Sequence, residues 1–187
     1  MREWIITNGI GGFASSTDKS INTRRYHGLL IASSNPPGQR KLILSKVDES
    51  IIINNKKYDL YSNESQGKIT EGYKYLVNFD KTIIPVYTYK VKNVIIEKSI
   101  CMLYGKNTVA IIYKIANQKA KTKLLLTPIV NFRDFHGETH DLKFRYKQKI
   151  NRDKVQLDFY EKGKINICVC GSKYQEYIDN IFYSMYY

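Results

Sequence analysis

Runs of alternating apolar and polar residues, broken by short turn sequences, predict antiparallel β-strands along most of the chain. In the clearest hairpin, Asn54-Asn55 joins Glu49–Ile53 to Lys56–Tyr61, because asparagine tolerates the positive φ that tight turns require. A second hairpin and the remaining strands are expected at Ile83–Val91, Val94–Leu103, Thr108–Ile115, Lys121–Asn131, Lys143–Ile150, Val155–Tyr160 and Lys164–Cys170. Many short strands with regular turns predict a mainly β fold, an antiparallel β-sandwich (supersandwich-like).

One segment has the spacing of an amphipathic helix. Between Tyr174 and Tyr187, apolar residues recur at i, i+3, i+4, i+7, i+8 and i+11, which predicts a short C-terminal helix. We therefore expect a β-sandwich domain over residues 1–170 and a C-terminal segment over residues 171–187. The chain ends on two tyrosines, which is compatible with a truncation or with a surface for a partner.

The composition is that of a folded protein. The 187 residues are 43% hydrophobic and 25% charged, which excludes wholesale disorder. No apolar run approaches the roughly 20 residues of a membrane helix. Glu3 and Asn8 interrupt the N-terminus before a signal-peptide core could form. We expect a soluble, cytoplasmic protein without a membrane partner.

The chain is strongly basic. Lys and Arg number 30 against 17 Asp and Glu, so the formal net charge is +13. Such an excess favours polyanions as partners. The lysines are dispersed, however, as at Lys90, Lys121 and Lys147, which is typical of a solvated surface and of protected sheet edges. Nucleic acid is therefore not the expected partner.

The chain has three cysteines, Cys101, Cys168 and Cys170. An odd number in a chain of this length argues against a disulfide framework. Cys168-Val169-Cys170 alone is a poor metal signal, because the motif lacks further ligands nearby. We interpret all three as core cysteines.

Residues 7–17 concentrate glycine and small hydroxyl residues in a predicted loop. Its glycines, which include Gly11 and Gly12, permit positive φ and a close approach of the backbone, so the loop can present N–H groups to a ligand. A phosphate-binding loop would need G-x-G-x-x-G before a helix, or Lys-Ser/Thr after the loop. Neither pattern is present, so no nucleotide cofactor is expected.

Residues 23–32, with the sequence TRRYHGLLIA, are expected to form a strand. Alternation along that strand would place Arg24 and Tyr26 on one face and Arg25 and His27 on the other. Arginine and histidine supply hydrogen-bond donors for hydroxyls or carboxylates, and tyrosine supplies a stacking surface. The alternative is that the arginines brace carboxylates inside the fold.

A second polar cluster covers residues 131–141. Two histidines, three acids and an arginine are compatible with acid–base chemistry or metal ligation. His136 and His140 have i, i+4 spacing, but Gly137 and the polar surroundings argue against a helical zinc site, so no metal is expected. The alternative is a polar loop held by an interaction between Arg133 and Asp134.

Taken in order, these segments carry a resemblance to a known family. The resembling stretches are EWIITNGIGGFASST (3–17), TRRYHGLL (23–30), NPPGQR (35–40), GYKYL (72–76), YGKNTV (104–109) and FRDFH (132–136). The chain resembles the N-terminal domain of bacterial and archaeal glycogen debranching enzymes of the amylo-α-1,6-glucosidase type. Ser20 departs from the family pattern, since glycine is expected at that turn.

The resemblance implies a β-sandwich placed before an (α/α)₆ barrel, which hydrolyses α-1,6-linked glucose at the branch stubs of glycogen or related glucans. The catalytic carboxylates of such enzymes lie in the barrel, so catalysis by residues 1–187 alone is not expected. The implied partners are an α-glucan (glycogen or a malto-oligosaccharide) and the catalytic barrel, in cis or in trans. No cofactor or metal is implied.

Ten residues from these motifs are candidates for a substrate-binding or interdomain face: Asn8, Gly11, Gly12, Arg24, Arg25, Tyr26, His27, Arg133, Asp134 and His136. Tyr26 would stack on a sugar ring, while Arg24, His27 and Asp134 would bond hydroxyls or brace the interface. The alternative for Arg25 and Arg133 is a structural role. Two other functions stay open: a split active site completed by a separate catalytic chain, and a basic module that binds polyanions.

Overall fold

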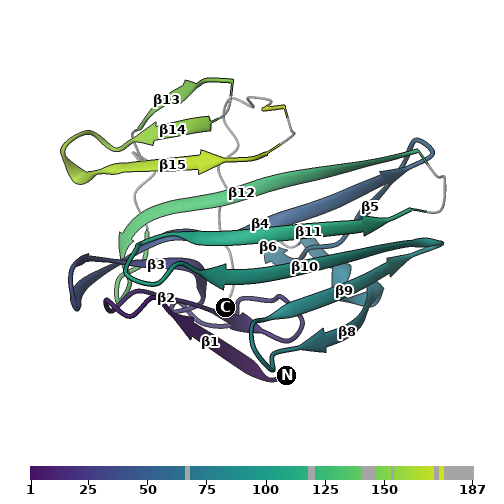
Figure 1. Ribbon diagram of the computed structural model, residues 1–187, viewed down its shortest axis with the longest axis horizontal. Helices are drawn as coiled ribbons and strands as arrows, with labels where there is room; N and C mark the ends of the chain where they lie inside the picture. Colours follow the sequence, from purple (N-terminus) through teal and green to yellow (C-terminus); the bar gives the residue numbers. More distant parts are fainter. Residues whose placement is uncertain (66–67, 118–120, 140–145, 153, 171–172, 175–187) are drawn as a thin grey trace. The chain divides into compact units, whose positions relative to one another are not determined.

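The structure is a computed structural model that describes residues 1–65, 68–117, 121–139, 146–152, 154–170 and 173–174. The described residues divide into two compact units, one formed by Met1–Glu138 and the other lying within Thr139–Phe182. Both units are built from antiparallel strands (Figure 1). Among the described residues, no helix is long and apolar enough to span a membrane.

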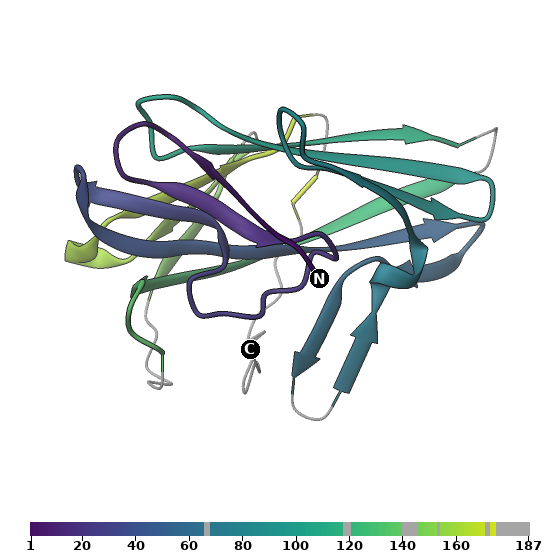
Figure 2. The same cartoon turned by 90° about the horizontal axis from the view of Figure 1, so that it is seen from below.

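Two large antiparallel sheets form most of the first unit. The larger sheet has the strand order β1-β2-β3-β4-β12, with β5 paired to β4; its members are β1 (Glu3–Thr7), β2 (Phe13–Thr17), β3 (Gly28–Asn35), β4 (Gly38–Ile53), β5 (Lys56–Asp59) and β12 (Thr122–Asp134). The smaller sheet has the order β11-β10-β9-β8, with β8 (Leu76–Asp80), β9 (Val86–Val91), β10 (Val94–Met102) and β11 (Val109–Ala116). A hairpin of β6 (Ser62–Ser65) and β7 (Lys68–Glu71) projects from these sheets and leads into the 3₁₀ helix η1, Gly72–Tyr75 (Figure 2).

The hydrophobic core lies between the two large sheets. One continuous cluster of buried side chains joins Trp4, Val47 and Ile51 of the larger sheet to Tyr87 and Ile96 of the smaller sheet. Because both sheets contribute their buried faces to one core, the predicted antiparallel β-sandwich is confirmed.

The tightest predicted turns are also confirmed. Asn54 and Asn55 connect β4 to β5 with φ values of 49° and 67°, the left-handed conformation that asparagine tolerates. Lys92-Asn93 connects β9 to β10, and the register of that hairpin begins at Val91 opposite Val94. Ser20, where glycine was expected, has φ of 55°, so this turn does require the left-handed region.

Several predicted boundaries are wrong, such as the strand expected from Ile83, which begins at Val86, and two of them fall in the candidate motifs. Residues 13–17 belong to strand β2 and not to a loop, because small residues there pair along β1 from Glu3 opposite Thr17 to Thr7 opposite Phe13. The strand predicted over residues 23–32 begins only at Gly28. Residues 24–27 form a turn instead, since the backbone N–H of His27 donates to the carbonyl oxygen of Arg24 at 3.0 Å.

The second unit contains the predicted meander. Its strands are β13 (Lys147–Ile150), β14 (Lys154–Asp158) and β15 (Lys164–Cys168), with the short 3₁₀ helix η2 (Tyr160–Lys162) between the last two. The predicted helix between Tyr174 and Tyr187 falls almost entirely outside the described residues. The division into residues 1–170 and 171–187 stays a prediction.

The three cysteines are not core residues, so that prediction is wrong. Cys168 and Cys170 are exposed, and Cys101 is only partly buried. All three are free thiols. The physical reason at Cys101 is the alternation of β10, whose buried positions are Val94, Ile96, Lys98 and Ile100, so residue 101 falls on the opposite face.

Candidate functional site

Arg133 ties together two of the predicted motifs that lie far apart in the sequence. Its guanidinium is buried at the end of β12 and donates from Nη2 to the carbonyl oxygen of Arg25 at 2.6 Å. Its Nη1 donates to the carbonyl oxygens of Asp134 (3.1 Å), Phe135 (3.2 Å) and Gly137 (2.6 Å). Arginine suits this position because its donors diverge in a fixed plane and it keeps its charge. Arg133 therefore holds the turn at residues 24–27 against the loop at residues 134–138.

This connection assembles a cluster of aromatic rings that we call the aromatic face, consisting of Phe13, Tyr26, Phe135 and His136. The centroid of the Phe135 ring lies 4.0 Å from that of His136, 5.5 Å from that of Tyr26 and 6.4 Å from that of Phe13. The Tyr26 hydroxyl lies 3.3 Å from Nδ1 of His136. Tyr26 is 39% exposed and His136 is also exposed, so part of the aromatic face is open to a ligand.

Two arginines flank the aromatic face. Arg25 lies over the Tyr26 ring at 5.8 Å, donates to the carbonyl oxygen of His136 at 3.1 Å and pairs with Glu138 at 3.8 Å. Arg40 lies over the Phe135 ring at 5.6 Å. Each guanidinium has five N–H donors, so both keep donors for a further hydroxyl or carboxylate.

The two described acids of the second polar cluster, Asp134 and Glu138, make local contacts. The carboxylate of Asp134 accepts a hydrogen bond from the backbone N–H of His136 at 2.9 Å, while Arg133 contacts only the backbone oxygen of Asp134. The suggested interaction between Arg133 and Asp134 therefore exists, but it is not an ion pair between their side chains. His140 lies outside the described residues, and within the described part of the chain no three His, Cys, Asp or Glu side chains are grouped to hold a metal ion.

The glycine-rich loop at residues 8–12 is organised by the fully buried side chain of Asn8. Its Oδ1 accepts hydrogen bonds from the backbone N–H groups of Ile10 at 3.1 Å and Gly12 at 2.9 Å. Its Nδ2 donates to the carbonyl oxygen of Lys106 at 3.0 Å and to Oδ1 of Asn107 at 3.2 Å. These two N–H groups are thus satisfied within the protein, and Asn8 fixes the loop to the turn at residues 104–107.

Gly11 permits a close contact between this loop and the turn between β3 and β4. Its φ is +94°, and a Cβ at this position would lie 2.3 Å from the carbonyl oxygen of Pro37. The carbonyl oxygen of Gly11 accepts a hydrogen bond from Nε of Arg40 at 2.6 Å. Because Arg40 also lies over Phe135, the loop supports one edge of the aromatic face.

Arg24 and His27 contact a residue outside the aromatic face, Glu3 of strand β1. Nε of Arg24 lies 2.7 Å from Oε1 of Glu3, and Nε2 of His27 lies 3.6 Å from the same oxygen. His27 is buried, and its Nδ1 accepts a hydrogen bond from the backbone N–H of Thr23 at 3.0 Å. A neutral imidazole with its proton on Nε2 satisfies both contacts.

The pKa of His27 leads to a testable pH dependence. Burial lowers this pKa from its ordinary value of 6.5, and the nearby Glu3 only partly opposes the effect. As the pH falls below 6.5, the unfolded state takes up a proton on this residue before the folded state does, so folding stability decreases. We expect His27 to contribute at most about 1.4 kcal/mol per pH unit to the change of the unfolding free energy with pH. Urea unfolding of the wild type and of His27→Gln between pH 8 and pH 5 measures this contribution. If the unfolding free energy of both proteins changes equally with pH, burial does not lower the pKa of His27.

The structure therefore separates the ten candidate residues into three groups. Arg25, Tyr26, Arg133, Asp134 and His136 are together at the aromatic face; Arg24 and His27 are together at Glu3; and Asn8, Gly11 and Gly12 are together in the loop. Sequence reasoning did not single out Glu3, Phe13, Arg40, Asn107 or Phe135. All five lie inside the family-like stretches, but nothing in their local spacing distinguishes them from core or surface residues.

Comparison with known proteins supports the resemblance noted in the sequence. A family model described as "Glycogen debranching enzyme N terminal" matches residues 2–187, which is nearly the whole chain. No curated protein and no solved structure matches.

Proposed function

Because the chain belongs to the glycogen debranching enzyme N-terminal family, we propose that its aromatic face binds α-glucan beside the catalytic domain with which this family associates. The observation that carries the proposal is the partly exposed group of Tyr26, Phe135 and His136, with Arg25 and Arg40 at its edges. The role as an N-terminal module of a debranching enzyme follows from the family; binding of glucan at this face and docking on the catalytic domain are proposals.

The chemistry of the aromatic face suits a sugar. A tyrosine or phenylalanine ring offers an apolar surface for the C–H groups of a glucose unit, and the tyrosine hydroxyl adds a polar contact. The two guanidinium groups donate hydrogen bonds to hydroxyls without needing a negative charge on the ligand. Arg133 holds the backbone beneath these groups, so little conformational freedom is lost on binding.

We propose that bond hydrolysis is carried out by the catalytic domain and not by residues 1–187. Hydrolysis with inversion needs two carboxyl groups about 6.5–9.5 Å apart, one acting as acid and one as base. At the aromatic face, the Asp134 carboxylate is occupied by the His136 amide, and Glu138 is paired with Arg25. These acids are engaged in holding the loop in place.

Replacing Tyr26 with alanine is expected to weaken binding of maltoheptaose by at least about tenfold, equivalent to about 1.4 kcal/mol. The reason is the loss of the exposed ring on which a sugar would pack. The measurement is a calorimetric titration of the purified chain at low and high salt. Tyr26→Phe is the matched control, because it keeps the ring and should retain most of the affinity.

Unchanged affinity in Tyr26→Ala, with the same melting temperature, would contradict glucan binding at the aromatic face. A duplex DNA titration in parallel tests the polyanion alternative, since such binding should fall steeply with salt whereas binding of a neutral glucan should not. If the chain binds neither ligand, glucan contact at this face is ruled out for the isolated chain. Docking is then tested by mixing the chain with the catalytic domain, supplied as a separate polypeptide, and measuring whether the two bind.

A further inference from the structure

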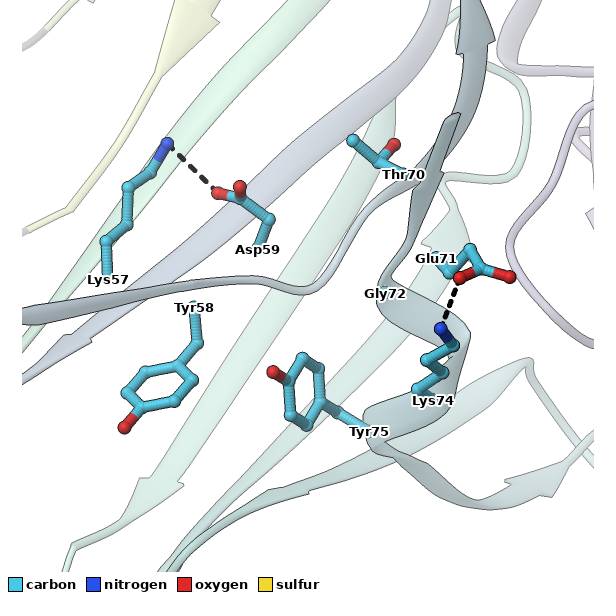
Figure 3. A pocket seen from close by; sticks show the side chains of 8 residues that line it. All are labelled: Lys57, Tyr58, Asp59, Thr70, Glu71, Gly72, Lys74 and Tyr75. Carbon is cyan, nitrogen blue, oxygen red and sulfur yellow. Dashed lines mark ion pairs between the residues drawn. The ribbon is translucent and has the colours of Figure 1, made fainter. Parts of the chain in front are cut away.

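A polar hollow of about 330 Å³ lies apart from the aromatic face, between β5, β7 and η1. Eight residues line it: Lys57, Tyr58, Asp59, Thr70, Glu71, Gly72, Lys74 and Tyr75. Figure 3 shows Lys57 and Asp59 on one side, Glu71 and Lys74 on the other, and the Tyr75 ring on the Lys74 side. The volume is at the lower end of the range typical of small-ligand sites.

The charges that line the hollow cancel. Nζ of Lys57 lies 2.9 Å from Oδ1 of Asp59, and Lys74 forms an ion pair with Glu71. The hydrogen bond with Lys74 lowers the pKa of Glu71, so this pair stays charged at neutral pH. The eight lining residues therefore carry two positive and two negative charges, which balance within the lining. The ammonium group of Lys74 and the carboxylate of Glu71 have further donor and acceptor capacity, which suits a neutral ligand rich in hydroxyls.

The two tyrosines add a ring surface. Tyr58 and Tyr75 are perpendicular, with their ring centroids 6.1 Å apart and an interplanar angle of 90°. Lys56 and Lys92 each lie 5.7 Å from the centroid of the Tyr58 ring, so cations already cover that ring. Tyr75 is therefore the ring that we assign to packing against a ligand.

The backbone around the hollow is fixed by contacts with residues 60–62. The N–H of Gly72 donates to the carbonyl oxygen of Tyr61 at 2.9 Å, and the N–H of Tyr73 donates to Oγ of Ser62 at 3.0 Å. A Cβ on Gly72 would lie 2.1 Å from both the carbonyl carbon and oxygen of Leu60, so only glycine allows η1 to approach this closely. The lining groups are thus held in position before a ligand arrives.

We propose that this hollow is a second glucan-binding site, which takes a short neutral segment of an α-linked oligosaccharide. The choice of glucan as the ligand rests on the proposed function, whereas the preference for a neutral polyhydroxylated ligand rests on the balanced charges and on Tyr75. A second contact at a distance from the first would let one branched chain bind the module at two points, and two linked contacts raise the overall affinity.

The test is a titration of the isotopically labelled chain with maltotriose, followed by amide chemical shifts. We expect two groups of residues to respond, those at residues 57–75 and those at residues 24–27 with 133–138. Tyr75→Ala should weaken the response of the first group by at least about tenfold and leave the second unchanged. Lys74→Met, which removes donors at a largely exposed position, should weaken the first group without affecting folding.

The outcomes separate the two proposals. A response at residues 24–27 and 133–138 alone would overturn the second site and leave the aromatic face supported. A response at residues 57–75 alone, lost in Tyr75→Ala, would support the hollow and overturn glucan binding at the aromatic face. No response at either place would overturn both proposals. If the amide shifts of residues 57–75 respond to maltotriose as strongly in Tyr75→Ala and in Lys74→Met as in the wild type, the hollow is not the binding site.

Discussion

Replacing Lys98 with methionine is expected to lower the free energy of unfolding by about 3–5 kcal/mol. Lys98 is 1% exposed in the middle of β10, and its Nζ lies 2.6 Å from Oε1 of Glu49 on β4, in the opposite sheet. The hydroxyl of Tyr113 donates to the same oxygen at 2.6 Å. Without the ammonium group, the carboxylate of Glu49 stays buried beside the Tyr113 hydroxyl but without its ion-pair partner, and burial of a charge that has lost its partner is costly.

The double variant Glu49→Met/Lys98→Met is the control for this prediction. It removes both charges and leaves side chains of similar size, so most of the lost stability should return. Urea unfolding of the wild type, each single variant and the double variant gives the coupling energy between the two residues. A loss below about 1 kcal/mol for Lys98→Met would show that water or a shifted side chain compensates Glu49, and the ion pair would then not be what joins the sheets at this point.

Replacing Arg133 with alanine is expected to separate the two halves of the aromatic face and to destabilise the fold by about 3 kcal/mol. The guanidinium donates to four carbonyl oxygens, one of them on Arg25 and three within residues 134–137. Hydrogen bonds from a charged donor contribute about 1.5–3 kcal/mol each to stability. The expected loss is smaller than their sum, because water can bond to some of the carbonyl oxygens that lose the guanidinium. Glucan affinity should fall together with stability, because Tyr26 and His136 lose their fixed separation.

Arg133→Lys is the matched control, since it keeps the charge but cannot reach four divergent acceptors from one ammonium group. We expect it to recover only a part of the stability and little of the glucan affinity. Denaturant unfolding and the maltoheptaose titration together measure both effects. If Arg133→Ala lowers stability but leaves the affinity unchanged, Arg133 does not position the aromatic face.

The strands that could be predicted from the sequence are those bounded by strong local signals. Asn54-Asn55 and Lys92-Asn93 mark tight turns, and the alternation on either side gives the correct pairing of β4 with β5 and of β9 with β10. Lys90, Lys121 and Lys147 are exposed as expected, whereas Lys46 and Lys98 are buried. Such features depend on neighbours within a few residues, which is the range over which a sequence pattern carries information.

Local sequence patterns fail where a particular side-chain contact overrides the alternation of apolar and polar residues. At residues 24–27, the His27 imidazole accepts a hydrogen bond from the Thr23 backbone, and this contact closes a turn within a segment whose alternation predicts a strand. Lys98 likewise occupies an inward position of β10, and Lys46 is buried beside Asp48 at 3.1 Å. Burial lowers the pKa of Lys46 and raises that of Asp48, a cost that only a specific partner offsets.

The antiparallel β class, the principal hairpins and the family could be predicted from the sequence, because turn chemistry, alternation and motif order are local properties of the chain. Which motifs contact one another depends on the tertiary fold. Arg25 and Tyr26 reach His136 across about 110 positions, Trp4 reaches Tyr87 across 83, and Glu49 pairs with Lys98 in the opposite sheet. The hollow at residues 57–75 likewise exists only because η1 packs against residues 60–62. Contacts of this kind depend on the register and packing of whole sheets, which no local pattern specifies.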